Sequence, residues 1–351
     1  MPPKSAYAKA GVDIDLGNQV KQTLPELLAS THRREVLGKV GGFGGLFAAG
    51  FKGYKNPVLV SSVDGVGTKL KVAFMTKRHD TIGEDLVNHC VNDILVLGAE
   101  PLFFLDYVGA GVLKPKVFDS IIRGFARGCK ANGCALIGGE TAQMPGFYQA
   151  DEYDVSGTIV GVVDKGSMLD GKKTKAGDVV IGIASNGLHT NGYSLARNIL
   201  FDKAGLKPSS KLEDLGCRVG DALLAVHLSY NKAIQRLLKR FNAKGKTPAI
   251  QALAHITGGG FQDNIPRNLP SKLDVRIERG SWEIPPLFQY LQREGKVSES
   301  EMFHVFNMGI GMTLTVRANR ADEILKALRR TEHSAWIIGE VVKGTGTVSL
   351  H

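Results

Sequence analysis

Two acidic side chains stand in parts of the sequence that otherwise predict buried backbone. Asp64 follows the apolar run "NPVLVSSV" and is followed in turn by Gly65 and Gly67. Asp93 lies inside "VNDILVLGAEP", where a charge is costly unless it is paired or bound to a metal. Carboxylate oxygens are ligands that Mg²⁺ prefers, and proteins usually hold Mg²⁺ together with phosphate groups. The two acids therefore predict a site for Mg²⁺ and a nucleotide phosphate.

Three further strands are predicted to end in the same way, with glycine or polar residues directly after an apolar run. A single such end is more often an ordinary loop, but four in one chain indicate a shared function. The polar ends of helices and turns also suit anions. The three additional sets are Gly138, Gly139, Glu140 and Thr141; Ser185, Asn186, His189 and Asn191; and His255, Thr257 and Gly258.

Other phosphate-binding motifs fit the sequence poorly. "GSMLDGKKT" resembles a P-loop, but Lys173 stands where Ser or Thr must hold Mg²⁺. No GxGxxG follows a predicted strand, so a Rossmann site has little support. "VGGFGGLF" is either a loop that wraps an anion or a surface hairpin.

Composition excludes several classes of protein. The chain has 351 residues, a net charge of +10 and scattered basic residues without an aromatic-interleaved stripe. This balance suits small phosphorylated ligands and argues against a nucleic-acid binder. No apolar run is long enough for a membrane span, and the N-terminus lacks a signal core, so we expect a cytoplasmic protein. The four cysteines form no CxxC pair and are expected to be buried free thiols.

The elements that must position these residues follow from periodicity. Residues 81–99 predict a helix whose capping box is Thr81 with Glu84, and residues 220–241 predict a second, longer helix. On the first helix, Asp85 and His89 share a face with Asp93, and we interpret them as a solvated stripe. The polar stretch 164–178 is the candidate boundary between an N-terminal domain, 1–168, and a C-terminal domain, 169–351.

Several long motifs resemble one known family. "DGVGTKL", "VNDILVLGAEP", "GGETAQMPG", "SNGLHTNGYSLAR" and "HITGGGFQDNIPR" occur here in the order found in aminoimidazole ribonucleotide synthetases, the phosphoribosylformylglycinamidine cyclo-ligases. The resemblance spans residues 7–345. It implies an α+β fold of two domains, with an N-terminal mixed sheet that pairs across a homodimer and a C-terminal α/β sandwich.

The resemblance also implies a reaction. ATP phosphorylates the formyl amide oxygen of formylglycinamidine ribonucleotide, the amidine nitrogen attacks the activated carbon, and phosphate leaves as the imidazole closes. The substrate is a small nucleotide, the cofactors are ATP and Mg²⁺, and a monovalent cation such as K⁺ is compatible. No membrane or nucleic-acid partner is implied.

Roles for individual residues follow from the same resemblance. Asp64, Asp93 and Glu140 would hold the metal, Lys69 would face the transferred phosphoryl, and His189 or His255 would move the proton. The ATP site would comprise Gly41, Gly42, Phe43, Gly44, Gly45, Asp64, Gly65, Gly67, Thr68, Asn92 and Asp93. The substrate site would comprise Gly138, Gly139, Thr141, Ser185, Asn186, Asn191, Thr257 and Gly258.

The sequence departs from the family in two places, and it leaves alternatives open. Val226 and His227 replace the usual Pro and Thr, and Gln143 replaces a more frequent Glu; we assign no function to these positions. Selenophosphate synthetase, thiamine monophosphate kinase, the hydrogenase maturation dehydratase and formylglycinamidine ribonucleotide synthetase share the wider ATP-site pattern. The reactive cysteines typical of the first and third are absent from the expected places. A basic nucleotide- or RNA-binding protein without catalysis is the non-enzymatic alternative.

Overall fold

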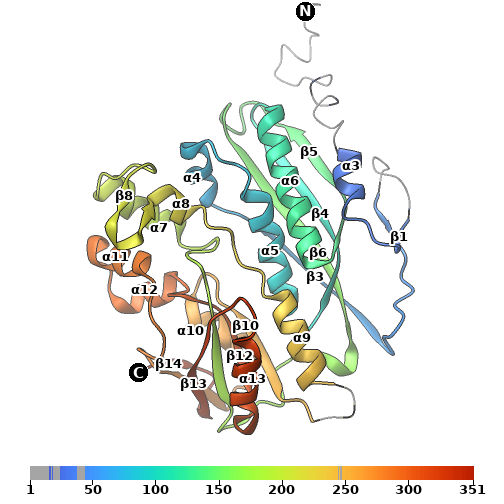
Figure 1. The fold of residues 1–351 in the computed structure, drawn as a ribbon, viewed down its shortest axis with the longest axis vertical. Coiled ribbons are helices and arrows are strands. Elements are labelled where there is room, and N and C mark those ends of the chain that lie inside the picture. The colour runs from blue at the N-terminus through green and yellow to red at the C-terminus, as the bar shows by residue number, and fades with distance from the viewer. Residues whose placement is uncertain (1–15, 17, 19–23, 38–43, 244, 246) are drawn as a thin grey trace, which may run out of the picture.

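Two separate β-sheets organise the chain (Figure 1). The computed structural model describes residues 16, 18, 24–37, 44–243, 245 and 247–351. The N-terminal sheet has the order β3-β6-β4-β5, and it is mixed because β4 and β5 are parallel whereas the other pairs are antiparallel. Its strands are β3 (Pro57–Gly65), β4 (Glu100–Ala110), β5 (Ala135–Gln143) and β6 (Tyr153–Asp164).

Helices α5 (Ile82–Leu95) and α6 (Pro115–Asn132) cover one face of this sheet, and α4 (Lys69–Thr76) lies beside them (Figure 1). The helix α6 begins with Pro115 and ends before Gly133, which adopts the left-handed conformation (φ +72°) that glycine permits. The predicted capping box at the start of α5 is wrong, because Thr81 makes no side-chain capping bond. Before β3, the described chain holds α3 (Leu24–Ala29) and the short strands β1 (Val36–Leu37) and β2 (Leu46–Phe47).

The C-terminal sheet has the order β10-β12-β7-β13-β11-β14 and carries helices on both faces. Its strands are β7 (Val179–Ala184), β10 (Ile250–His255), β11 (Leu273–Ile277), β12 (Ile310–Val316), β13 (Ala335–Lys343) and β14 (Val348–Leu350). Helices α9 (Asn231–Phe241) and α13 (Ala321–Leu328) share one apolar cluster with the sheet. The other helices are α7 (Tyr193–Arg197), α8 (Val219–Leu223), α10 (Gly260–Asn264), α11 (Pro286–Gly295) and α12 (Glu299–Val305), and β8 (Lys211–Leu212) pairs with β9 (Cys217–Arg218).

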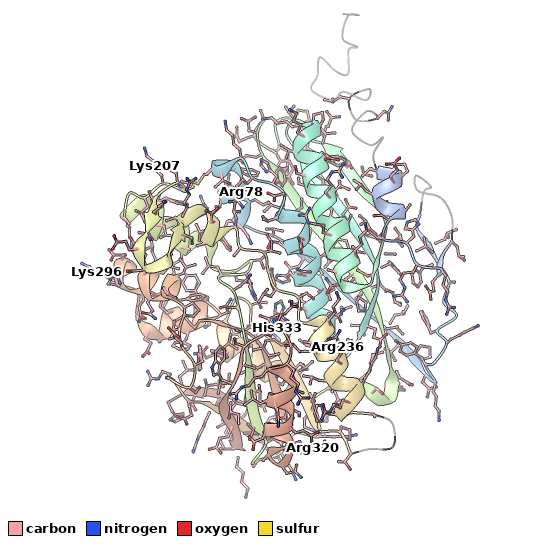
Figure 2. All side chains as sticks on the ribbon, in the orientation of Figure 1. Arg78, Lys207, Arg236, Lys296, Arg320 and His333 are labelled. Atoms are coloured by element: carbon pink, nitrogen blue, oxygen red, sulfur yellow. The ribbon has the colours of Figure 1, made fainter. Side chains whose placement is uncertain are left out.

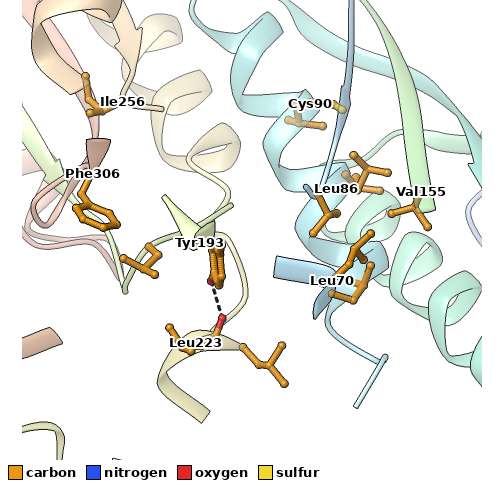
Figure 3. Packing of buried hydrophobic residues seen from close by; sticks show 14 of the residues in the cluster. Leu70, Leu86, Cys90, Val155, Tyr193, Leu223, Ile256 and Phe306 are labelled. Atoms are coloured by element: carbon orange, nitrogen blue, oxygen red, sulfur yellow. Dashed lines mark hydrogen bonds between the residues drawn. The ribbon is translucent and has the colours of Figure 1, made fainter. Parts of the chain in front are cut away.

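Apolar packing continues between the two domains. One cluster of buried residues includes Leu70, Leu86 and Val155 of the N-terminal domain as well as Leu223 and Phe306 of the C-terminal domain (Figure 3). The two-domain α+β fold is thereby confirmed, with an apolar core that joins the domains. Within the described residues, no helix is both long and apolar enough to cross a membrane.

The prediction of one long helix over 220–241 is wrong. The chain forms α8, leaves helical geometry at 224–230, and resumes as α9. The cause is a set of hydrogen bonds from α5: Asp85 accepts from the backbone N–H of His227 (2.7 Å), and Asn88 donates to its carbonyl (2.7 Å). Asn92 accepts from the Tyr230 N–H (3.0 Å). These bonds satisfy backbone groups that a helix would otherwise pair internally.

Basic side chains are spread over the surface. Figure 2 shows Lys296 and Arg320 well apart from each other, whereas Arg78 and Lys207 lie on the same part of the molecule and line one pocket. Several of the arginines are engaged by acids: Arg78 pairs with Asp221, and Arg320 pairs with Glu323. Such pairing offsets part of the positive charge on the described surface.

Candidate active site

A pocket of about 480 Å³ lies at the junction of the two domains. The N-terminal domain contributes the end of β3 and the last turns of α5, and the C-terminal domain contributes the end of β10 and the segment after α10. The volume falls in the ordinary range for small-molecule sites. The polar lining residues are Ser61, Ser62, Asp64, His89, Asp93, His255, Thr257, Asn264, Arg267 and Asn268.

The predicted proximity of Asp64 and Asp93 is confirmed. One nitrogen, His89 Nε2, lies 2.9 Å from Asp64 Oδ2 and 3.7 Å from Asp93 Oδ2. Asp93 also accepts hydrogen bonds from Ser62 Oγ (3.1 Å) and from His255 Nδ1 (2.8 Å). Burial raises the pKa of both carboxyls, but their histidine partners outweigh it and hold each pKa below its usual value. Both acids are therefore ionised at neutral pH.

The interpretation of Asp85 and His89 as a solvated stripe is wrong. Both side chains are buried, because the segment 224–230 covers the polar face of α5. Burial lowers the pKa of His89, but Asp64 and Asp93 together raise it above its ordinary value. His89 thus bridges the two carboxylates, and their charges favour its protonated form.

Four histidines form a cluster behind the pocket, and sequence reasoning missed one of them. His227 is fully buried and lies against His89, His189 and His255, with ring centroids 4.0–5.1 Å away. The signal was present, since His227 is one of the departures from the family pattern. A residue inside one long predicted helix has no assigned neighbours from other segments, so the sequence alone gives His227 no partners.

His189 has the most unusual backbone in the cluster. Its φ is +60°, a strained value for a residue with a Cβ, and strain of this kind concentrates at functional sites. Burial holds its pKa well below the ordinary value, so the ring is neutral. Both ring nitrogens are buried, and neither has a hydrogen-bond partner among the described residues.

Lys69 does not face the pocket, contrary to expectation. Its ammonium is fully buried and donates to Asp85 Oδ1 (2.8 Å), Ala225 O (2.7 Å) and His189 O (3.3 Å). These three acceptors use all three of its protons. Lys69 therefore ties α4 and α5 to two loops of the C-terminal domain and has no free donor for a phosphoryl group.

Several other predicted residues serve the junction or its loops. Asn92 Nδ2 donates to Leu228 O (2.8 Å), Thr68 Oγ1 meets Ser194 Oγ (3.0 Å), and Asn186 Nδ2 donates to Val226 O (2.8 Å). Ser185 Oγ donates to Asn307 Oδ1 (2.9 Å). An amide nitrogen of Asn191 is buried without a partner among the described residues, and this side chain lies near Gly258.

The backbone of the predicted "DGVG" phosphate turn is partly occupied. The Gly65 N–H donates to the carboxylate of Asp64 (2.7 Å). Gly67 has φ +65°, so it provides the left-handed turn that leads into α4.

Glu140 lies apart from the other predicted metal ligands. The cross-strand partners of Asp64 run through Gly157 and Asp106 to Gly139, so three strand spacings, roughly 14 Å, separate the two edges. Within one chain, Glu140 therefore cannot share an ion with Asp64, and its carboxylate accepts from the Thr141 N–H (2.9 Å). The same edge holds Gly138, Thr141 and Gly45, and Gly45 lies against Ile137. Of the other predicted glycine-loop residues, Gly44 is described and Gly41–Phe43 lie outside the described residues.

The pocket suits a hard cation more than the histidine cluster does. Asp64 and Asp93 present ionised oxygens beside Ser62 and Thr257, which is the donor chemistry that Mg²⁺ prefers. His189, His227 and His255 also bring nitrogens within 4.8 Å of one another. However, the rings of His189 and His227 stack with centroids 4.0 Å apart at 22°, so their lone pairs lie in separate, nearly parallel planes, an arrangement that disfavours a shared ion.

Two mixed sheets joined by a carboxylate–histidine pocket place the chain in a class of two-domain α+β proteins. Family models of "AIR synthase related protein" match both parts: the N-terminal domain over residues 48–163 and the C-terminal domain over 175–351. The chain belongs to the phosphoribosylformylglycinamidine cyclo-ligase family. A relative of that name from Trichlorobacter lovleyi is 51% identical over 97% of this chain and 95% of its own length. Another from Syntrophotalea carbinolica is 50% identical, over 99% and 98%.

Solved structures of more distant proteins share the fold. Thiamine-monophosphate kinase from Stenotrophomonas maltophilia superposes with a TM-score of 0.68 at 16% identity, covering 93% of this chain and 95% of its own. HypE from E. coli gives a TM-score of 0.67 at 17% identity, covering 96% and 93%. At such identities the likeness shows the arrangement of the two domains and no more.

Proposed function

We propose that this chain catalyses the ATP-dependent ring closure of formylglycinamidine ribonucleotide to 5-aminoimidazole ribonucleotide, releasing ADP and phosphate. The observation that carries the proposal is the paired, ionised Asp64 and Asp93 at a pocket between domains. Relatives named for this reaction are about half identical to the chain over nearly its whole length. The product belongs to purine biosynthesis.

The pocket residues divide the chemistry between them. Asp64 and Asp93 would hold Mg²⁺, and when bound the ion neutralises phosphate charge and orients the triphosphate. Arg267 lies in the pocket wall and is the cation placed to meet an anionic group there. These residues position the amide oxygen of the substrate as nucleophile, and its phosphorylation makes it a good leaving group.

His255 is the stronger candidate for moving the proton during ring closure. It lines the pocket and donates from Nδ1 to Asp93, whereas His189 lies deeper in the cluster. Burial lowers the pKa of His255 more than Asp93 raises it, so its ring is neutral at physiological pH; its one lone pair, on Nε2, lies 3.0 Å from His227 Nε2, so a proton would reach the ring through that contact. Asp93 then stabilises the imidazolium that forms.

Lys69 and Asn92 take structural roles in this proposal. The glycine-rich residues from Gly41 to Gly45, and Gly138, Gly139 and Thr141, remain predicted nucleotide and substrate contacts. They lie outside the described residues or at the far edge of the N-terminal sheet. A requirement for K⁺ is a separate prediction, which salt replacement tests.

A homodimer is also proposed, through the outer face of the N-terminal sheet. Alternation places Ser62 and Asp64 of β3 toward α5, so Leu59 and Val63 point to the opposite face. Their exposed fractions are 60% and 64%, which is costly for aliphatic side chains in water. Light scattering of the purified protein tests this, and a monomer at micromolar concentration would refute it.

Incubation with substrate decides the function. Pure protein with formylglycinamidine ribonucleotide, ATP and Mg²⁺ is expected to release one phosphate for each aminoimidazole formed. Omission of the ribonucleotide is expected to suppress phosphate release. Absence of the aminoimidazole product in the complete mixture would refute the proposal.

A further inference from the structure

A continuous chain of hydrogen bonds runs behind the pocket and joins its two carboxylates. It passes through three histidines and one threonine, all of them buried. In order, the contacts are Asp64 Oδ2 to His89 Nε2 (2.9 Å), His89 Nδ1 to Thr190 Oγ1 (2.6 Å), Thr190 Oγ1 to His227 Nδ1 (3.3 Å), His227 Nε2 to His255 Nε2 (3.0 Å) and His255 Nδ1 to Asp93 Oδ1 (2.8 Å).

Ionised Asp64 and Asp93 together with a neutral His255 ring set the direction of the bonds in this chain. Ionised carboxylates only accept, so His89 donates from Nε2 and His255 donates from Nδ1. His255 must then accept at Nε2 from His227, and His227 must accept at Nδ1 from the Thr190 hydroxyl. Thr190 accepts in turn from His89 Nδ1. Each contact holds one proton, and His227 is the single link between the two halves.

The placement of His227 does not depend on these ring contacts alone. Its backbone N–H and carbonyl are both bonded to α5, through Asp85 and Asn88. The Asn92 amide nitrogen, 3.2 Å from Nε2, is itself a donor and gives its hydrogen bond to the Leu228 carbonyl, so it packs against the ring and leaves Nε2 to face His255. The imidazole is therefore held rigidly from the same helix that carries His89 and Asp93, as a group that orients others must be.

We propose that His227 is a positioning residue for the pocket: it fixes the ring orientation and tautomer of His255, and thereby the orientation of the Asp93 carboxylate toward the bound cation. The activity readouts of this proposal rest on the proposed function, but the tautomer readout does not. His227 never touches the pocket, so its effect must pass through its neighbours.

The test compares His227→Leu, which removes the donor, with His227→Gln, whose amide can still donate toward His255. For His227→Leu we expect kcat to fall about tenfold, half-saturation by Mg²⁺ to need severalfold more ion, and the ¹⁵N signals of His255 to lose a single tautomer. For His227→Gln, we expect both kcat and the Mg²⁺ concentration at half-saturation to stay within about threefold of the natural values.

The matched control is His333→Leu. His333 is buried and contacts the Tyr230 ring, but it lies outside the hydrogen-bonded chain. This variant is expected to keep the natural Mg²⁺ dependence even if it loses thermal stability. An unchanged His255 tautomer in folded His227→Leu would overturn the proposal, as would an unchanged kcat.

A second variant keeps the test decisive if His227→Leu does not fold. Thr190→Val is nearly isosteric and breaks the chain between His89 and His227. We expect Thr190→Val to raise the Mg²⁺ concentration needed for half-saturation. A half-saturation equal to that of the natural protein would overturn the proposal. If the natural protein forms no product, the proposed function fails, while the His255 tautomer still reports on His227.

Discussion

The two edges of the N-terminal sheet carry similar sequences in different surroundings. At the β3 edge, Asp64 ends a strand and is followed by glycines; at the β5 edge, glycines precede Glu140. Asp64 meets α5 and lies in the interdomain pocket, whereas Glu140 is exposed and, in the described part of the chain, is bonded to its neighbouring amide. The same glycine–acid pattern at a strand end is thus covered by another segment at Asp64 and stands exposed in its own chain at Glu140.

An acid with a raised pKa lies behind each edge, Asp85 fully buried and Asp106 half-buried, and the two are compensated differently. Asp85, behind the pocket, has a pKa raised to about 6 by burial, and Lys69 limits the rise. Asp106 lies beneath Gly139 at the other edge, and burial raises its pKa to about 7, with Glu140 adding to the rise. One edge is built around an ion pair, whereas the other tolerates a carboxyl that is neutral in much of the physiological range.

The largest effect is expected from Lys69→Met, which leaves Asp85 buried without its cation. Breaking a buried pair from one side costs about 3–5 kcal/mol of unfolding free energy. Lys71→Met is the control, because Lys71 lies on the same helix and pairs with Glu152 at the surface; a change of no more than about 1 kcal/mol is expected there. Urea unfolding measures both, and equal losses would show that the Lys69 pair is no stronger than a surface bridge.

The sequence was sufficient to predict most helices and strands and the proximity of Asp64 and Asp93. Strand alternation and helical periodicity depend on local chemistry, so β6, α6 and most other elements could be predicted. The break at 224–230 could not, because its cause is the set of α5 groups that bind its backbone. The role of Lys69 was missed for the same reason: a lysine beside a glycine turn indicates phosphate until Asp85 is found 2.8 Å away.

Asp106→Asn is expected to stabilise the protein at alkaline pH. Its native pKa of about 7 exceeds the unfolded value, so stability is fully present below about pH 4 and is lost as pH rises through 7. Asparagine removes this loss, with a gain of roughly 2–4 kcal/mol at pH 8 and little gain at pH 4. Melting temperatures of both proteins at the two pH values check this, and a gain independent of pH would contradict the raised pKa.

Asp93→Asn is expected to lower kcat at least about tenfold, or roughly 1.4 kcal/mol in the barrier. The amide retains the shape but loses the charge that holds the cation, so half-saturation should need more Mg²⁺. Initial rates over a range of Mg²⁺ concentrations measure both effects. Rates equal to those of the natural protein across that range would remove Asp93 from the metal site.

The smallest effect is expected from Glu140→Gln, since its carboxylate reaches no pocket residue of its own chain. We expect kcat within about threefold of the natural value, well short of the loss that removal of a metal-supporting group produces. A loss as large as that of Asp93→Asn would mean that a second copy brings its β5 edge to the pocket. Mixing the two inactive variants then discriminates, because a hybrid dimer could assemble one pocket from Asp93 of one protomer and Glu140 of the other. Recovered activity in the mixture would show that the β3 edge of one protomer and the β5 edge of the other form one site. A fully active Glu140→Gln would show that the two edges act separately.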